Sequence, residues 1–435
     1  MSLNKLPYRG TRDFFPAQMR LRDYIFDKMK IVSERFGFEP YDGPLLEEVE
    51  LYLAKSGEEL INEQIYSFID RGERKVAIRP EMTPTVARMV AQIHREVPKP
   101  VRWYAIPNLM RYEKPQKGRL REFWQYNADI FGAGLYGEVE AIQLAVAIMK
   151  EFGATQDQFE ILVNDRKIVE AYFNHVLKIS PEQSLKLSKV IDKAKKVSAE
   201  GLDKMILEVL TDEAQIRSFK SYLELTTFDD LKAFLKKSDL TEVLTHITSF
   251  VSKLELCKIN QYVKYDPTIV RGLDYYTGIV FEIFDKHPEN KRAIAGGGSY
   301  ANLLQIFNEP ALEGVGFGLG EVPLTEFLKS HELLPQMEKA QLDFLISYGL
   351  DEAETFAFEL SSFLREKKLK VELYPGASKP KKVFGYADKK DIRYFVYLGE
   401  DEVSNKKFIV KNLKEKTQMT YDFHDLTKMI EGLKG

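Results

Sequence analysis

The chain alternates between stretches with helical spacing of apolar residues and short apolar runs. Residues 17–36 carry apolar side chains at helical spacing among charged ones, which predicts an amphipathic surface helix. The runs 75–79, 101–106 and 123–131 are short and β-prone, so they predict strands of an antiparallel sheet. Residues 139–149 repeat apolar side chains at three- and four-residue steps, and we expect this helix to pack on that sheet.

The sequence pattern changes three times after residue 164. Lys- and Glu-rich sequence with regularly spaced leucines, free of glycine loops, predicts an inserted helical domain, after which short strands and dense glycine return. Beyond Pro335 the pattern becomes βαβ-like. We therefore expect an α+β chain: a catalytic domain split between 1–164 and 257–332, a helical insertion at 165–256, and an α/β domain at 338–435.

Composition narrows the possible roles. The 435 residues are 44% hydrophobic and 30% charged, and their net charge of −3 provides no whole-molecule attraction to nucleic acid, so a polyanion site must be a local patch. The single cysteine, Cys257, excludes an intramolecular disulfide or a Cys-rich zinc site and fits a reducing, cytoplasmic compartment. No apolar stretch is long enough to cross a bilayer, so we expect no membrane role.

The segment 111–125, RYEKPQKGRLREFWQ, is a polar loop with Pro and Gly between two strand-like flanks. It predicts a basic hairpin whose arginines clamp a phosphate while Phe123 offers a flat face to a base, as ATP requires. Taken alone, the same segment is equally consistent with a solvated hairpin whose aromatic side chains only pack.

A second segment, RGLDYYTG at 271–278, is followed by AGGG at 295–298. An arginine, two phenols and flanking glycines allow the backbone to approach a small ligand closely. The structural alternative is a glycine-rich turn with tyrosines in a core.

Together with RPEMT at 79–83 and QYNAD at 125–129, these segments resemble the signature motifs of histidyl-tRNA synthetases, in order and at similar spacing. The resemblance covers nearly the whole chain. It begins with GTRDFFP at 10–16, includes a dimer-interface motif, FGFEPYDGPLLE, and ends in a segment similar to the family's anticodon-binding domain, KKVFGYADKKDIRYFVYLGEDEV. It implies a class II antiparallel-sheet catalytic domain, the helical insertion, a C-terminal α/β anticodon-binding domain and a two-fold homodimer.

The resemblance also implies the histidine site. A carboxylate and a phenol can each pair with one imidazole nitrogen, which would reject side chains that leave them unsatisfied. The implied roles are Glu81, Thr83 and Gln125 on the α-amino group, Asp129 and Tyr276 on the two imidazole nitrogens, Tyr275 shaping the pocket and Arg271 at the carboxylate.

For ATP, the implied set is Arg111 on the α-phosphate, Arg119 and Arg121 near the phosphates, Glu113 near the adenine or a magnesium ion, and Phe123 stacked on adenine. Arg271 and Arg111 are the expected catalytic residues. A fixed guanidinium can stabilise the negative charge of the carboxylate and phosphate groups during adenylate formation, where a metal ion would otherwise be needed. ATP and Mg²⁺ are the implied cofactors, with no metal ligand set identified in the protein. For the second step, a phosphate oxygen of the adenylate is the expected proton acceptor.

The implied partner is tRNA(His). Residues 379–416 hold eleven basic and six acidic residues, which suits the anticodon arm, although a lysine-rich solvated face would look the same. Lys114 and Gln116 are expected at the acceptor end, and Tyr386 is expected to stack on an anticodon base.

Two positions depart from the family pattern. The segment 316–324, GFGLGEVPL, lacks the arginine that class II enzymes usually place on the ATP γ-phosphate side, and Arg119 is a candidate replacement. Ser299 and Ala301 stand where the family commonly has an Arg and an Asp. Both members of that charge pair are therefore missing together, which avoids leaving one buried charge unpaired.

The motifs favour one of three functions. We expect ligation of L-histidine to tRNA(His) through a histidyl-adenylate. The alternatives are a catalytically silent histidine-binding paralogue, acting as a regulatory subunit in histidine biosynthesis, and another class II synthetase. The intact RGLDYYTG and the anticodon-like domain argue against the paralogue, and Asp129 with the two tyrosines argues against the other synthetase.

Overall fold

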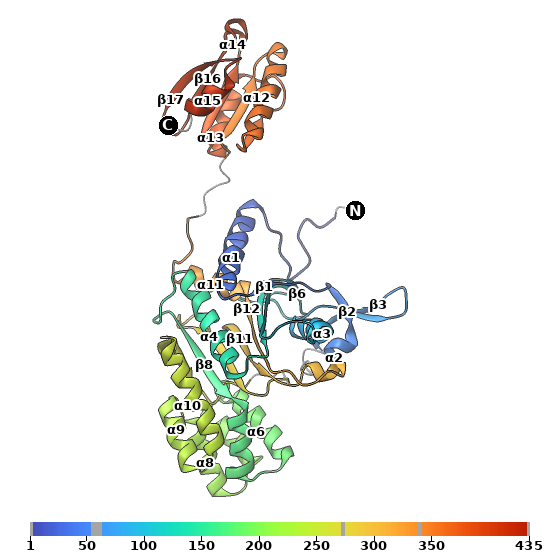
Figure 1. Cartoon of the computed structure of the whole chain (residues 1–435), viewed down its shortest axis with the longest axis vertical. Helices are drawn as coiled ribbons and strands as arrows, with labels where there is room; N and C mark the ends of the chain where they lie inside the picture. Colours follow the sequence, from blue (N-terminus) through green and yellow to red (C-terminus); the bar gives the residue numbers. More distant parts are fainter. Residues whose placement is uncertain (1–2, 54–62, 271–274, 337–341, 433–435) are drawn as a thin grey trace. The chain divides into compact units, whose positions relative to one another are not determined.

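The computed structural model describes residues 3–53, 63–270, 275–336 and 342–432. Its contacts divide the chain into two compact units, Met1–Pro335 and Gln336–Gly435 (Figure 1). Each unit has hydrophobic clusters of its own. Among the described residues, no helix is both long and apolar enough to cross a membrane.

Unit 1 is built on a mainly antiparallel sheet, as the sequence predicted. Only the pairs β1–β5 and β8–β9 on its main path run parallel. The strands lie in the order β1 (Glu39–Pro40), β5 (Val101–Ala105), β7 (Glu122–Phe131), β12 (Gly314–Gly320), β11 (Ala293–Tyr300), β10 (Ile279–Asp285), β8 (Phe159–Asp165) and β9 (Val263–Tyr265), and β6 (Asn108–Met110) pairs with β7.

The two faces of this sheet differ because side chains alternate along each strand. On β7, Tyr126, Ala128 and Ile130 belong to the main core with α1 (Pro16–Arg35) and α4 (Gly134–Glu151). These are the two helices that the apolar spacing predicted. The opposite face of β7 presents polar side chains, and this face carries the candidate site.

Smaller elements border the polar face. Helix α3 (Thr83–Ile93) packs with Tyr275, Tyr276 and Tyr300 in a separate cluster. The short sheet beside it has the order β2 (Leu46–Glu48), β4 (Lys75–Ile78), β3 (Tyr66–Ile69), and α2 (Val49–Leu53) and η4 (Leu304–Phe307) lie next to these elements. Helix α11 (Glu321–Ser330) follows β12 directly.

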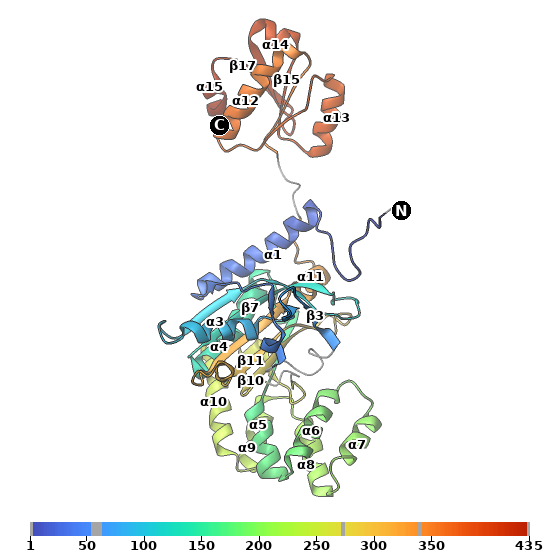
Figure 2. The ribbon, with the colours of Figure 1, turned by 90° about the vertical axis from the view of Figure 1, so that its right-hand side faces the viewer.

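A helical segment connects β8 with the short 3₁₀ helix η3 (Asn260–Tyr262) and β9 (Figure 2). Polar N-caps begin several of its helices: Ser180 forms a capping box, and Asp212 and Thr227 accept from backbone amides. The elements are α5 (Arg166–Ala171), η2 (Tyr172–Leu177), α6 (Pro181–Lys193), α7 (Ala199–Leu207), α8 (Glu213–Leu223), α9 (Phe228–Lys237) and α10 (Thr241–Leu256). Their buried residues join the main core, and the separate insertion domain stays a prediction.

Unit 2 is a mixed sheet covered by helices. Its first three strands run parallel, as the βαβ pattern predicted, whereas β16 and β17 add an antiparallel hairpin. The sheet order is β14 (Val371–Leu373), β13 (Phe344–Tyr348), β15 (Tyr394–Leu398), β16 (Lys407–Asn412), β17 (Thr417–Asp422), and the helices are η5 (Asp351–Ala353), α12 (Glu354–Glu366), α13 (Pro380–Lys390), α14 (Glu400–Asn405) and α15 (Leu426–Gly432).

Candidate active site

Glycines on β11 and β12 carry no side chains, so they leave the backbone of the sheet uncovered on its polar face. Gly316 lies opposite Asp129 in the register of β12 with β7, and Gly318 lies opposite Asn127. A Cβ atom added to Gly316 would lie 2.1 Å from Oδ1 of Asp129, which is too close for any side chain. The glycines are therefore required here for space, and they let a ligand approach the backbone of the sheet.

One pocket on this face collects the residues expected to bind histidine, apart from Arg271, which lies outside the described residues. They come from the segment that leads into α3, from β7 and from the segment before β10, so the fold joins positions almost two hundred residues apart. The pocket is lined by Glu81, Thr83, Arg111, Gln125, Asn127, Asp129, Tyr275, Tyr276, Gly296, Tyr300, Gly316, Phe317 and Gly318.

Asp129 is one of two buried carboxylates in this pocket. Its side chain accepts a hydrogen bond of 2.5 Å from the hydroxyl of Tyr300. Burial raises the pKa of Asp129 to about 7, and the Tyr300 hydrogen bond opposes that rise. A donor or cation that enters the pocket would favour the ionised carboxylate, so this position suits one nitrogen of an imidazole.

A second carboxylate, Glu81, is also buried in the pocket. The hydroxyl of Tyr275 lies within hydrogen-bonding distance of both Oε2 of Glu81, at 3.3 Å, and Oγ1 of Thr83, at 3.4 Å. Burial raises the pKa of Tyr275 well above its ordinary value, so the phenol stays a neutral donor. The pocket therefore offers two separate carboxylates to a ligand with two cationic or hydrogen-bond-donating ends.

Arg111 lines the same pocket. Its Nε donates to the carbonyl oxygen of Pro80 at 2.9 Å, and its guanidinium carbon lies 5.5 Å from the ring centre of Phe123. Burial lowers the pKa of Arg111, although the charges of Glu81 and Glu113 act against this shift. Arg111 thus places a fixed positive charge between the pocket and the aromatic face of Phe123.

The predicted basic hairpin is confirmed. Strands β6 and β7 pair antiparallel, and the tip closes through paired backbone hydrogen bonds between Gln116 and Arg119, with Gly118 at a φ of 75°. Near the tip, Lys114 and Gln116 are exposed, so both are accessible to a large partner.

The remaining residues expected to bind ATP lie along this hairpin, beside the pocket. Arg119 forms an ion pair with the buried carboxylate of Glu113. Arg121 instead donates to the Glu113 carbonyl at 3.2 Å and to the Tyr8 hydroxyl at 2.8 Å, and it lies over the Tyr112 ring. Glu113 is consequently the centre of this group.

Both departures from the family pattern have visible structural partners. Glu321, next to the expected arginine position, is buried and forms a two-pronged ion pair with Arg12, at 2.7 and 3.3 Å. Ser299 donates to Oε1 of the buried Glu138 at 2.6 Å. The other oxygen of Glu138 lies 3.4 Å from Nε2 of His246, so a hydroxyl and an imidazole from α10 surround this carboxylate.

Three of these residues were missed from the sequence. Tyr300 and Asn127 line the pocket, and Arg12 pairs with Glu321. Asn127 and Arg12 stand in the motifs QYNAD and GTRDFFP, and Tyr300 lies two residues after AGGG, but their contacts join segments that are distant in the sequence. Strand alternation from Asp129 could have placed Asn127 on the same face, whereas no sequence signal indicated the bond from Tyr300.

Residues 10–321 match the family model described as Histidyl-tRNA synthetase. The chain belongs to the histidyl-tRNA synthetase family. Residues 343–433 match a second model, the Anticodon binding domain, within unit 2. The class II assignment made from the motifs is therefore confirmed.

Similar curated proteins span the full length of this family member. A histidine–tRNA ligase of Leptospira biflexa is 40% identical over 98% of this chain and 97% of its own. A histidine–tRNA ligase of Thermoplasma volcanium is 34% identical over 97% of both chains.

Solved structures share the synthetase fold. A histidyl-tRNA synthetase from Nostoc sp. PCC 7120 has a TM-score of 0.78 at 23% identity and covers 99% of both chains. A Bacillus halodurans structure, titled an ATP phosphoribosyltransferase regulatory subunit/histidyl-tRNA synthetase, has a TM-score of 0.77 at 22% identity. It covers 92% of this chain and 99% of its own.

Proposed function

We propose that this chain joins L-histidine to tRNA(His) in two steps, through a histidyl-adenylate. The observation that carries this proposal is the buried Asp129 opposite Gly316 of β12, in a pocket that also holds the buried Glu81. Histidine presents a cationic amino group at one end and an imidazole at the other. Membership of the histidyl-tRNA synthetase family supports the same substrate.

In the proposed complex, Glu81, Thr83 and Gln125 hold the α-amino group, while Asp129 and Tyr276 each take one imidazole nitrogen. The bond from Tyr300 supports this role for Asp129, because it fixes the carboxylate against the sheet. An amino acid without a matching donor would leave Asp129 buried and unpaired, which is the basis for selectivity.

ATP would bind beside this pocket along the hairpin. Arg111 contacts the α-phosphate, Arg119 and Arg121 lie near the phosphates, and Phe123 stacks on the adenine. A magnesium ion fits the same end of the site, because Oε1 of Glu113 is buried and has no hydrogen-bond partner among the described residues. When bound, the ion would neutralise phosphate charge.

In the first step, a carboxylate oxygen of histidine bonds to the α-phosphorus as the bond to the β-phosphate oxygen breaks, releasing pyrophosphate. Arg271 and Arg111 stabilise the charge on the reacting groups. In the second step, the terminal ribose hydroxyl attacks the acyl carbon, AMP leaves, and a phosphate oxygen of the adenylate accepts the proton.

The tRNA and the second subunit belong to the same proposal. Lys114 and Gln116 would meet the acceptor end, and the basic excess of residues 379–416 would meet the anticodon arm. Tyr386 remains a proposed stacking residue, although Lys390 already lies 5.3 Å from its ring centre. We also propose a homodimer in the cytoplasm, where tRNA is charged, and sedimentation at several concentrations tests the assembly.

Histidine-dependent exchange of labelled pyrophosphate into ATP tests the activity. We expect exchange with histidine alone among the amino acids, and a loss of at least about a hundredfold in Arg271→Ala, as for one missing charge-stabilising group. Arg217→Ala is the matched control, because among the described residues Arg217 pairs only with the exposed Glu213 in the helical segment, and the variant should exchange normally.

The Bacillus halodurans structure, described as an ATP phosphoribosyltransferase regulatory subunit/histidyl-tRNA synthetase, supports a second candidate function. In this alternative, the chain would be a regulatory subunit that binds histidine without adenylating it. Measurable histidine binding without any exchange would replace the ligase proposal with this one. Exchange that requires histidine and Arg271 would exclude it.

A further inference from the structure

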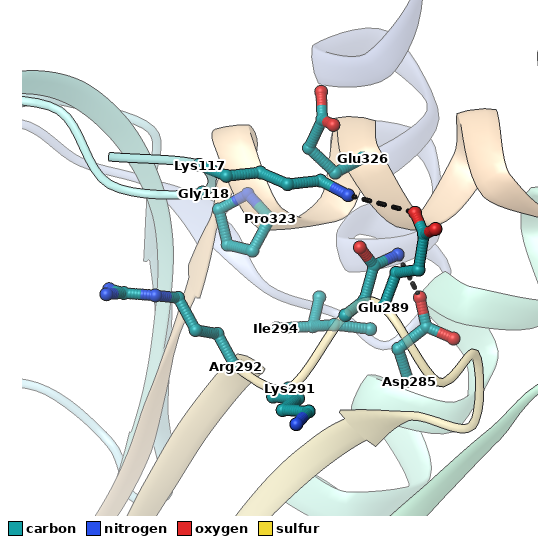
Figure 3. Close-up of a pocket in the computed structure, with 10 residues that line it drawn as sticks. Lys117, Gly118, Asp285, Glu289, Lys291, Arg292, Ile294, Pro323 and Glu326 are labelled. Carbon is teal, nitrogen blue, oxygen red and sulfur yellow. Dashed lines mark hydrogen bonds and ion pairs between the residues drawn. The ribbon is translucent and has the colours of Figure 1, made fainter. Parts of the chain in front are cut away.

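Arg292 stands immediately before β11, at the end of the site where the hairpin tip meets the start of α11. Its side chain passes along the hairpin turn: a Cβ atom added to Gly118 would lie 3.5 Å from Cδ of Arg292. Gly118, Arg292 and Pro323 line one pocket, so three separate elements converge here (Figure 3).

The acidic side chains of this pocket have other partners. Lys117 pairs with Glu289 at 3.6 Å, and Asn290 donates to Asp285 at 2.7 Å. Figure 3 shows the Arg292 guanidinium pointing away from these carboxylates. Over the described part of the chain, no carboxylate lies within ion-pairing distance of Arg292, and no hydrogen bond engages its guanidinium. Its charge is therefore uncompensated by a direct contact.

A second guanidinium shares this environment. Burial lowers the pKa of Arg292 first, and the positive charge of Arg119 lowers it further, whereas Glu113 acts in the opposite direction. Glu113 is already in contact with Arg119. Two partly buried arginines therefore lie near a single carboxylate, which pairs with only one of them, and a multiply charged anion between them would relieve their repulsion.

The strand register explains why Arg292 reaches this place. Ala295 pairs with Leu319 in the antiparallel ladder of β11 and β12. Arg292 precedes Ala295 by three residues, and Val322 follows Leu319 by three residues at the start of α11, so both lie at the same end of this ladder. The GEVPL segment here contains no arginine. A guanidinium from the neighbouring strand therefore reaches the same end of the site.

We propose that Arg292, together with Arg119, binds the β- and γ-phosphates of ATP and orients the pyrophosphate that leaves. This inference rests on the proposed function, which supplies ATP as the substrate. It adds Arg292 to the site and assigns Arg119 to the terminal phosphates, with Arg111 left to the α-phosphate.

Equilibrium binding of ATP and of AMP, each by calorimetry, tests this assignment on the full chain. In Arg292→Gln we expect ATP binding to weaken about tenfold or more, as for a lost charge-assisted hydrogen bond, and AMP binding to stay unchanged. Arg292→Lys should recover part of the loss. Lys264→Gln is the control, because it removes the same charge from an exposed position on β9, outside this pocket, and should bind both nucleotides normally.

Pyrophosphate exchange gives a second readout: Arg292→Gln should raise the KM for ATP and leave the KM for histidine unchanged. Equal losses of ATP and AMP binding, or no loss of either, would overturn the proposal. Binding distinguishes it from the parent function. The wild-type chain could fail to exchange pyrophosphate while its preference for ATP over AMP still depends on Arg292. That result would refute the ligase function and support the phosphate site.

Discussion

At the scale of single residues, the pocket is dominated by groups whose charge is costly to bury. Asp129 lies 3% exposed with Tyr300 as its hydrogen-bond donor, and its pKa of about 7 reflects that burial. The sequence motif named this aspartate, but its pKa depends on strands that are distant in sequence. Burial and the Tyr300 contact could not be predicted from QYNAD.

Asp129→Asn should therefore separate binding from stability. We expect the KM for histidine to rise about tenfold to a hundredfold, because a charged hydrogen bond contributes roughly 1.5–3 kcal/mol. In the wild type, the KM should fall as the pH rises through about 7, since Asp129 then ionises. The exchange assay at pH 6 to 8.5 checks this, and a variant with the same pH profile as the wild type would contradict it.

The same substitution should stabilise the protein without ligand at high pH. The pKa of Asp129 is about 7 in the fold, above its ordinary 3.8, so the native state holds its proton longer than the unfolded chain. Stability from this group consequently falls as the pH rises from about 4 to about 7. We expect Asp129→Asn to melt above the wild type at pH 8 and close to it at pH 5; the reverse order at pH 8 would refute the argument.

At the scale of elements, β12 shows why the glycine strand has its composition. Gly314, Gly316 and Gly318 each face a side chain of a neighbouring strand at less than 3 Å from an added Cβ. The sequence identified the strand and its glycines. Only the register showed that Gly316 faces Asp129, because the pairing of distant strands is a tertiary property.

Gly316→Ala should disrupt the histidine pocket. The added methyl would overlap the Asp129 carboxylate, so we expect a cost of about 1–3 kcal/mol in stability and loss of histidine-dependent exchange. Gly385→Ala is the control, because an added Cβ there meets nothing within 4 Å and the residue lies in α13. Melting and exchange assays on both variants test this prediction. Equal losses of stability and of exchange in the two variants would contradict the steric explanation.

Helix α10 contacts α4 and the end of β8 through the imidazole of His246. His246 lies 3.4 Å from Glu138 and 3.5 Å from Asp165, and both carboxylates are buried. The nearby Glu138 carboxylate raises the pKa of His246 above its ordinary 6.5, although burial and Lys167 oppose this. Burial raises the pKa of Asp165 to about 6, and the Glu138 charge adds to that rise.

His246→Leu should cost about 1–3 kcal/mol near pH 6, because it leaves buried carboxylates without their cation. A raised histidine pKa contributes stability that is present below 6.5 and is lost as the pH rises through the raised value. The melting difference from the wild type should therefore shrink by pH 9. A difference that is independent of pH would show that His246 contributes only packing.

At the scale of the whole molecule, the two units have separate hydrophobic clusters. The proposed chemistry lies entirely in unit 1, and the anticodon-binding match lies in unit 2. We expect a chain ending at Pro335 to fold and to keep histidine-dependent pyrophosphate exchange near the wild-type rate.

That shortened chain should charge tRNA roughly tenfold or more less efficiently, since each 1.4 kcal/mol of lost contact is a factor of ten. Exchange and charging assays on the same preparation make the comparison. Loss of both activities in a chain that still unfolds cooperatively would contradict the division of labour between the units.

The sequence by itself determined the element types, the hairpin and the family, because these depend on local spacing, turn residues and motifs that lie close together in the chain. The tertiary structure decided which side chains meet: Tyr300 with Asp129, Arg12 with Glu321, and His246 with Glu138. Strand register and helix packing set those contacts, and burial then shifts the pKa of Asp129, so neither could be deduced from local sequence alone.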